Sequence, residues 1–216
     1  MEGVPVRIEH TVLGPTTTWS DVKAVLDAAR ELGMRACLPP CYAADAVAYA
    51  PAVDVTTVVG FPHGQHTGTV LCEEAARAWN DGVAEIDVVC NVGRALADEI
   101  ETVREVLAEL VASVPIPVKV IVEAPLLDEG TLHSVCEAAA DADASFVKTA
   151  TGFSEGGATV EDVSLMSEYL PVKASGGIGS WADAKRMFDA GAERIGTSSG
   201  DTIVREYRDA TGGMDG

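Results

Sequence analysis

The sequence predicts an α/β protein, a single-domain (β/α)₈ TIM barrel, on three observations. Eight short apolar segments recur along the 216 residues, and each is followed by a helical pattern. Strict alternation of strand and helix implies parallel pairing of the strands. Eight such units in about 200 residues match a barrel at the short end of its size range. A doubly wound open sheet is the alternative, but no GxGxxG motif follows the first apolar segment.

The expected elements follow one another without a linker or a second domain. The predicted strands cover 6–11, 34–38, 53–60, 84–90, 118–123, 144–149, 172–175 and 194–197. The predicted helices cover 19–32, 42–50, 68–81, 97–113, 129–140, 159–169, 180–190 and 200–209. Short polar residues such as Asp128, Thr159 and Ser180 mark helix starts, and Gly33 and Gly191 mark helix ends just before a strand. We therefore expect one barrel domain over 1–210 and a flexible tail over 211–216.

The charge balance excludes some partners. The chain has 34 acidic and 15 basic residues and a net charge of −19. Such an excess disfavours nucleic acid and anionic membrane surfaces as partners. It is spread along the predicted helices, which favours a solvated surface adapted to concentrated salt. An ordinary acidic protein from a low-salt environment is the alternative.

Cysteine usage and hydropathy indicate a cytoplasmic protein. No apolar run reaches membrane-spanning length, and no leader opens the chain. The five cysteines are odd in number and contain no CxxC pair. We therefore expect reduced, mostly buried thiols, and neither a disulfide framework nor a zinc site.

Lysine is rare in this chain, yet it occurs in the predicted strands. Only five residues are lysine, and three of them lie in strand segments: Lys119, Lys148 and Lys173. A strand covered on both faces leaves an ammonium group buried, so the group must be paired, hydrated or neutral. Two ammonium groups at the ends of neighbouring strands oppose each other's protonation, and a neutral amine is a nucleophile. Lys148 and Lys173 are therefore the candidate catalytic pair.

Carboxylates in the other strands are expected to face the same interior. Alternation places these residues on a shared face of one strand: Glu9 with Thr11, Glu85 with Asp87, and Lys119 with Glu123. Asp87 interrupts an apolar run, so we expect Lys148 and Lys173 to be its partners across the barrel. For Lys119 with Glu123, a purely structural ion pair is an equally good interpretation.

Two glycine loops predict an anion site. Gly176-Gly177 follows the seventh predicted strand, and Gly196-Thr197-Ser198-Ser199-Gly200 spans the end of the eighth. Barrels commonly bind phosphate at these loops, through backbone amides and a helix N-terminus. Gly152, after the sixth strand, is expected to join the same pocket.

The segment His63-Gly64-Gln65-His66 is a weak candidate for a metal site. It offers two histidines and no evident third ligand, so a loop after the third strand is the preferred interpretation. We expect no metal ion.

Taken in order, these segments resemble the 2-deoxyribose-5-phosphate aldolase family of class I aldolases. The resemblance covers nearly the whole chain. It depends on the segments IEHT (8–11), VVGFPHG (58–64), EIDVV (85–89), KVIVE (119–123), FVKTATGF (146–153), GGAT (156–159), VKASGG (172–177) and RIGTSSG (194–200). The run around Lys148 is the most specific of them.

The resemblance implies a fold, an activity and a set of site residues. Lys148 would form the Schiff base, Lys173 would keep its amine neutral, and Asp87 would take part in proton transfer. Contacts to the substrate would come from Thr11, Glu9, Cys37, Lys119, Thr151, Gly152, Gly176, Gly177, Gly196, Ser198 and Ser199. The implied reaction is reversible cleavage of 2-deoxy-D-ribose 5-phosphate to D-glyceraldehyde 3-phosphate and acetaldehyde, in deoxyribonucleotide catabolism. No cofactor is implied, a homo-oligomer is expected, and the acidic surface suggests a halophilic archaeon as the source.

The chain also departs from the family pattern. Glu9 stands where aspartate is usual, and Gly179 stands where an arginine commonly follows the Gly-Gly-Ile run. Asp201 places a carboxylate beside the expected phosphate site, and no terminal tyrosine ends the chain. Alternatives are another Schiff-base phosphosugar aldolase, a transaldolase-like barrel, or a non-catalytic sugar-phosphate sensor.

Overall fold

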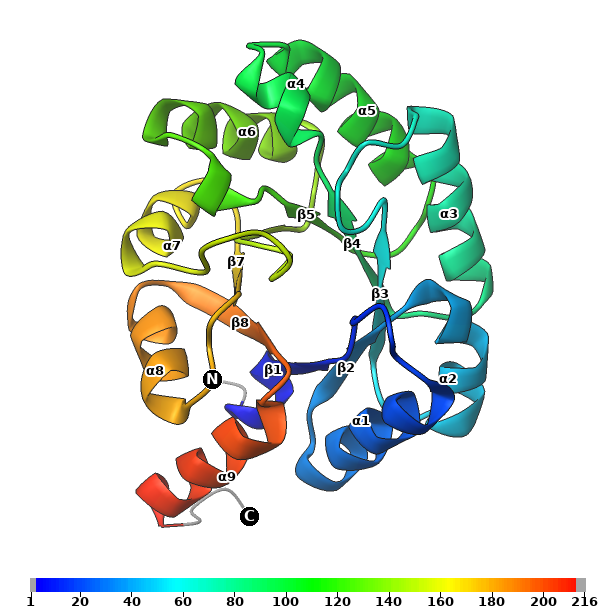
Figure 1. The fold of residues 1–216 in the computed structure, drawn as a ribbon, viewed down its shortest axis with the longest axis vertical. Coiled ribbons are helices and arrows are strands. Elements are labelled where there is room, and N and C mark those ends of the chain that lie inside the picture. The colour runs from blue at the N-terminus through cyan, green and yellow to red at the C-terminus, as the bar shows by residue number, and fades with distance from the viewer. Residues whose placement is uncertain (1–2, 213–216) are drawn as a thin grey trace.

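A closed ring of eight parallel strands forms the centre of the computed structural model, which describes residues 3–212 (Figure 1). The strands pair in chain order, and β1 closes the ring against β8. They are β1 (Ile8–Thr11), β2 (Arg35–Leu38), β3 (Val55–Val59), β4 (Glu85–Val89), β5 (Val118–Ile121), β6 (Phe146–Lys148), β7 (Val172–Ser175) and β8 (Ala192–Thr197). The predicted (β/α)₈ barrel is confirmed, and the open sheet is wrong.

The α-helices lie outside the ring and cover its outer face (Figure 1). They are α1 (Trp19–Leu32), α2 (Ala43–Tyr49), α3 (Gly68–Asn80), α4 (Val92–Leu96), α5 (Ile100–Ala112), α6 (Glu129–Asp141), α7 (Val160–Met166), α8 (Trp181–Asp189) and α9 (Gly200–Thr211). Each longer helix buries one apolar stripe, as Val22, Leu26 and Ala29 do in α1. Small side chains such as alanine let the helices approach the strands closely.

Local differences from the predicted elements have local causes. The first strand begins at Ile8, because Pro5–Arg7 forms a 3₁₀ turn before it. The segment predicted as one helix over 97–113 is preceded by the short helix α4, which the sequence pattern missed. Asn91 starts α4, where its side chain accepts a hydrogen bond from the Arg94 backbone at 3.0 Å. Two further 3₁₀ turns cover Pro40–Tyr42 and Ala124–Leu126.

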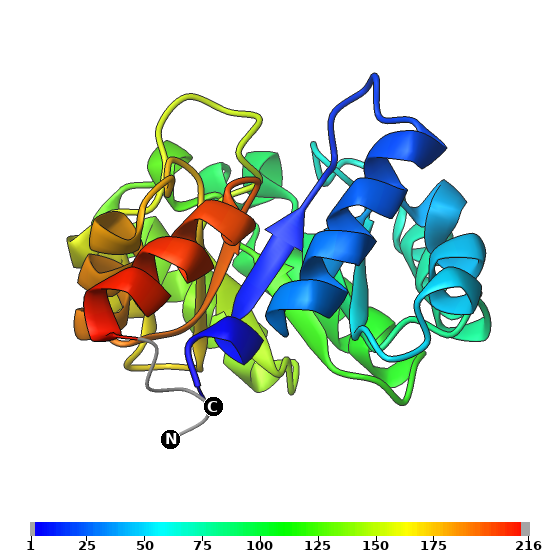
Figure 2. The same cartoon turned by 90° about the horizontal axis from the view of Figure 1, so that it is seen from below.

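The carboxyl ends of the strands form one edge of the barrel, where the loops after β1 and β6 rise highest (Figure 2). Register partners in parallel strands point the same way, so the pairing of Lys148 with Lys173 and of Asp87 with Lys119 brings these side chains into one interior. At the other end of the chain, Thr211 closes α9 and Gly212 caps it. The rest of the expected flexible tail, 213–216, lies outside the described residues, and its flexibility stays a prediction.

Within residues 3–212, no helix is long and apolar enough to cross a membrane.

Candidate active site

Asp87 is the centre of the polar interior of the barrel. Its side chain is fully buried and contacts three lysines. The Nζ atoms of Lys119 and Lys148 each lie 3.0 Å from a carboxylate oxygen of Asp87, and Nζ of Lys173 lies 2.7 Å away. The predicted approach of Asp87 to Lys148 and Lys173 is therefore confirmed.

The charges of Asp87 and the lysines stabilise one another's charged forms. Burial raises the pKa of Asp87, but Lys119, Lys173 and Lys148 lower it more strongly, and the net pKa is well below its ordinary value. Burial lowers the pKa of Lys173, yet Asp87 and Glu9 raise it above its ordinary value. The expectation that the two lysines oppose each other's protonation is thus wrong for Lys173, because the charges of Asp87 and Glu9 hold it as an ammonium ion.

Glu9 reaches this cluster from β1. Its carboxylate accepts a hydrogen bond from Lys173 and lies 3.5 Å from Lys119 and 3.4 Å from Arg194. Burial raises the pKa of Glu9, and the charges of Lys119 and Lys173 lower it to below its ordinary value. Glutamate at this position therefore joins the interior ion pairs.

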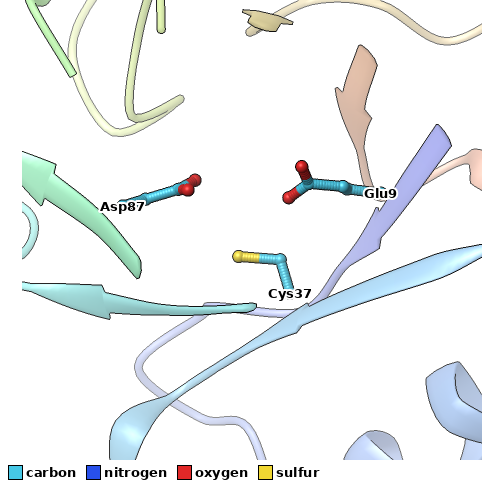
Figure 3. Close-up of side chains that lie close together, drawn as sticks. All are labelled: Glu9, Cys37 and Asp87. Carbon is cyan, nitrogen blue, oxygen red and sulfur yellow. The ribbon is translucent and has the colours of Figure 1, made fainter. Parts of the chain in front are cut away.

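Cys37 lies beside the two carboxylates and points toward them (Figure 3). One ligand atom each from Glu9, Cys37 and Asp87 lies within 4.8 Å of the others, which is close enough to hold a metal ion. The chemistry of the group argues against a metal, because three lysines already neutralise both carboxylates and would repel a cation. Burial also raises the pKa of the Cys37 thiol to about 11, so the thiol is protonated at neutral pH. His63 and His66 line two different cavities.

Lys119 does not pair with Glu123, so that predicted pair is wrong. β5 ends at Ile121, and Glu123 has a left-handed backbone with φ of 56°. Its carboxylate instead accepts hydrogen bonds from the Thr151 backbone at 3.1 Å and from the Ser154 hydroxyl at 2.8 Å. Glu123 therefore supports the loop after β6.

A cavity of 440 Å³ opens above Lys148 at the carboxyl edge of the barrel. It brings together many residues predicted to bind substrate: Thr11, Thr151, Gly152, Gly176, Gly177, Gly196, Ser198 and Ser199. The other predicted site residues do not line it: Glu9, Cys37, Asp87, Lys119 and Lys173. All five are buried within the barrel, in contact with or beneath Lys148.

Glycines after β7 and in β8 leave the backbone of the cavity wall uncovered by side chains, so that other groups can approach it closely. Gly176 and Gly177 have φ of 97° and 76°, a left-handed conformation that glycine adopts without strain. A Cβ atom on Gly157 would lie 2.6 Å from the Gly176 carbonyl oxygen, so the loops after β6 and β7 pack backbone to backbone. Lys148 is the charged residue among those that line the cavity. An anion here would therefore be held by backbone N–H groups and hydroxyls.

The sequence analysis missed a second layer of charged residues below Asp87. Glu85 lies 2.6 Å from Lys119 and also contacts Arg194 and Arg35. Alternation in β4 placed Glu85 on the face of Asp87. Arg35 begins β2, and Arg194 began the predicted eighth strand although β8 starts at Ala192, so both arginines resembled surface residues. Their shared contact with Glu85 depends on the closed barrel, which brings β2, β4 and β8 around one interior.

Comparisons with known proteins agree with this geometry. No family model matches the chain. It is 61% identical to deoxyribose-phosphate aldolase of Haloarcula marismortui over 213 residues, which covers 99% of the chain and 92% of that protein. It is 55% identical to deoxyribose-phosphate aldolase of Halobacterium salinarum over 207 residues, 95% of the chain and 98% of that protein.

Solved structures show the same fold. An aldolase named QR15 superposes with a TM-score of 0.94 at 35% identity, and each chain is covered completely. A deoxyribose phosphate aldolase from Aeropyrum pernix, described as tetrameric, superposes with a TM-score of 0.89 at 33% identity, over 96% of this chain and 92% of that one.

Proposed function

The chain belongs to the deoxyribose-phosphate aldolase family, and on that premise we propose that it is a lyase that cleaves 2-deoxy-D-ribose 5-phosphate reversibly. The products are D-glyceraldehyde 3-phosphate and acetaldehyde. The observation that carries the proposal is the position of Lys148, which reaches the floor of the cavity while its Nζ lies 3.0 Å from the buried Asp87. A Schiff-base aldolase needs an amine that meets the substrate on one side and proton-transferring groups on the other.

Lys148 acts as the nucleophile. Its neutral amine attacks the C1 carbonyl carbon of the open-chain sugar, and loss of water gives an iminium ion. Lys173 keeps its own proton, because Asp87 and Glu9 raise its pKa. Lys173 is therefore a fixed positive charge that shares Asp87 with the reacting amine of Lys148.

Cleavage of the C2–C3 bond follows from the iminium. The 3-hydroxyl proton passes through water to the Asp87–Lys173 pair, and the electrons of the C2–C3 bond move toward the iminium nitrogen. D-Glyceraldehyde 3-phosphate leaves with a new carbonyl group. The remaining enamine takes a proton on C2, and water hydrolyses the resulting iminium to acetaldehyde and free Lys148.

The phosphate group lies against the loops after β7 and β8. The binding residues are Gly176, Gly177, Gly196, Ser198 and Ser199, and Thr151 and Gly152 line the same cavity. Thr11 contacts the sugar from β1. Glu9, Lys119 and Cys37 act from beneath the cavity and maintain the charge and shape of its floor.

The relatives do not favour the other candidate functions, namely a different Schiff-base aldolase, a transaldolase-like enzyme or a non-catalytic sensor. We further propose a homo-oligomer, since one structural relative is described as tetrameric. A cytoplasmic location accords with five free cysteines in the described chain.

Trapping of the Schiff base tests the proposal. Sodium borohydride with acetaldehyde should leave an ethyl group on Lys148, detected by peptide mass spectrometry. Lys148→Ala should lower kcat for 2-deoxyribose 5-phosphate by at least about a thousandfold, as expected for loss of a nucleophile. The matched control is Lys185→Ala, because Lys185 lies on α8 and pairs with Asp189 at 2.6 Å. An unmodified Lys148, or near-normal turnover of Lys148→Ala, would refute the proposal.

A further inference from the structure

Below the groups that face the cavity, the barrel contains a second charged layer made of Glu85, Arg194 and Arg35. Arg194 donates to Glu85 and lies 3.4 Å from Glu9. Glu85 lies 2.6 Å from Lys119, which itself contacts Asp87 at 3.0 Å. Arg35 lies 3.3 Å from Glu85 and 3.0 Å from Asp54. A continuous chain of ion pairs therefore runs from the floor of the cavity to the amino-terminal end of the strands.

This network has one basic group more than it has carboxylates. Its basic residues are Arg35, Lys119, Lys148, Lys173 and Arg194, and its acidic residues are Asp54, Glu9, Glu85 and Asp87. Asp54 is exposed, but the surplus is still one when its pair with Arg35 is left out. The interior residues are then Lys119, Lys148, Lys173 and Arg194 against Glu9, Glu85 and Asp87. A surplus charge in the interior is unfavourable, so one basic group has reason to lose its proton. Arginine stays protonated in proteins, so the group that loses its proton must be one of the lysines.

Contacts decide which lysine becomes neutral. Among residues 3–212, Lys119 forms ion pairs with three carboxylates and Lys173 with two, whereas Lys148 pairs with Asp87 alone. Lys148 is also the lysine that lines the cavity, where water can accept its proton. The surplus therefore falls on the residue that must act as the nucleophile.

We propose that Glu85 and Arg194 are positioning residues that set the charge balance of the barrel interior and thereby the pH range in which Lys148 is a free amine. The proposal rests on the proposed function, because it assigns to this pair the control of the Schiff-base step. Neither residue lines the cavity above Lys148, so neither is a catalytic residue. Their effect acts through Lys119, Glu9 and Asp87.

The groups that face Lys148 and its partners come from seven of the eight strands. They are Glu9 from β1, Arg35 and Cys37 from β2, Glu85 and Asp87 from β4, Lys119 from β5, Lys148 from β6, Lys173 from β7 and Arg194 from β8. Burial raises the pKa of the Cys37 thiol to about 11, so Cys37 adds no charge near neutral pH. Glu85 and Arg194 are thus opposite charges held at one place in the interior.

The two members of this pair have opposite effects on Lys148. Removal of the negative charge in Glu85→Gln makes the interior more positive, so Lys148 should lose its proton at lower pH. Removal of the positive charge in Arg194→Gln makes the interior more negative, so Lys148 should keep its proton to higher pH. A merely structural role for the pair predicts weaker activity in both variants, without opposite shifts.

The test is the pH dependence of the Schiff-base reaction. The rate of borohydride trapping with acetaldehyde and the kcat/KM for 2-deoxyribose 5-phosphate are measured across pH for each variant. The acidic limb of both profiles should move down by about one pH unit in Glu85→Gln and up by about one unit in Arg194→Gln, a size typical of a charge about 10 Å away in a protein interior.

Two further variants keep the test independent of folding. Arg194→Lys keeps the positive charge, so the acidic limb of the pH profiles should stay at its wild-type position. The double variant Glu85→Gln/Arg194→Gln removes one charge of each sign, so the acidic limb should return close to the wild-type position. Shifts in the same direction, or no shift in folded variants, would overturn the inference while leaving the proposed function intact. A wild-type enzyme that forms no adduct on Lys148 would instead refute the proposed function.

Discussion

At the scale of single residues, the cavity proposed to bind the phosphate has few charges of its own. Lys148 is the charged residue among those that line this cavity, and the proposed mechanism uses its amine for covalent chemistry. Neutral N–H and O–H donors bind anions more weakly than charged donors do. The enzyme should therefore depend less on the phosphate than one that carries a cation in this wall.

Gly179 offers a place to add that cation. A Cβ atom at Gly179 would meet no atom within 4 Å, and its backbone lies outside the left-handed region. Gly179→Arg should raise the ratio of kcat/KM for 2-deoxyribose 5-phosphate over 2-deoxyribose by at least about tenfold, because a hydrogen bond to a charged group contributes about 1.5–3 kcal/mol.

The control for this change is Gly179→Gln, which adds a long side chain without a charge and should leave the ratio close to the wild-type value. An unchanged ratio in Gly179→Arg would show that backbone amides and hydroxyls already saturate phosphate recognition.

The sequence alone could predict that Lys148, Lys173 and Asp87 meet in the barrel interior, because charged residues inside apolar strands are conspicuous. It could not assign their full set of partners. Arg194 and Glu85 are 109 positions apart, and they meet only because β8 and β4 point into the same closed ring. Glu123 was misplaced because its left-handed backbone ends the alternation on which the prediction depended.

At the scale of elements, β4 carries two acids that should make the fold sensitive to low pH. Burial raises the pKa of Glu85, but the charge of Lys119 and hydrogen bonds from Arg194 and Lys119 lower it from 4.5 to about 2. An acid whose pKa is lower in the folded state than in the unfolded chain stabilises the fold at pH values above its pKa in the unfolded chain. That stabilisation is lost as the pH falls from about 4.5 toward about 2.

Thermal melts of wild type and Glu85→Gln between these pH values would measure this effect. The shift corresponds to a free energy on the order of 3 kcal/mol, so wild type should lose Tm across the window more steeply than the variant. Parallel pH profiles for the two proteins would mean that Glu85 titrates normally in the folded state.

Helix and strand order could be predicted well because parallel strands and amphipathic helices have different hydrophobic periods. The short helix α4 could not be predicted, since its five residues, Val92–Leu96, are too few for a hydrophobic period to appear. Turns and bends follow local hydrogen bonds, and these depend on neighbouring elements.

At the scale of the whole molecule, the net charge of −19 dominates the surface. Repulsion among so many carboxylates opposes the compact state, and salt screens it. The Debye length falls from about 10 Å at 0.1 M salt to about 3 Å at 1 M. Identity to proteins of halophilic archaea agrees with a surface of this kind.

Stability should therefore rise with salt. Tm is expected to increase by about 10 °C or more between about 0.1 M and about 3 M KCl, which is several kcal/mol for a chain of this size. Sucrose at matched osmolality controls for exclusion of solutes from the surface and should have a smaller effect. A flat salt profile would contradict the interpretation of the acidic surface.

The interior ion pairs also affect how the chain finds its fold. A strand that slips by one residue turns its inward side chains toward the helix layer. In β5, β6 or β7, such a slip would bury a lysine among aliphatic groups and leave its partner carboxylates buried without a cation. The folded state would lose several kcal/mol of stability. The charges that are proposed to serve the reaction thus also destabilise misregistered barrels, so they select the correct strand register during assembly.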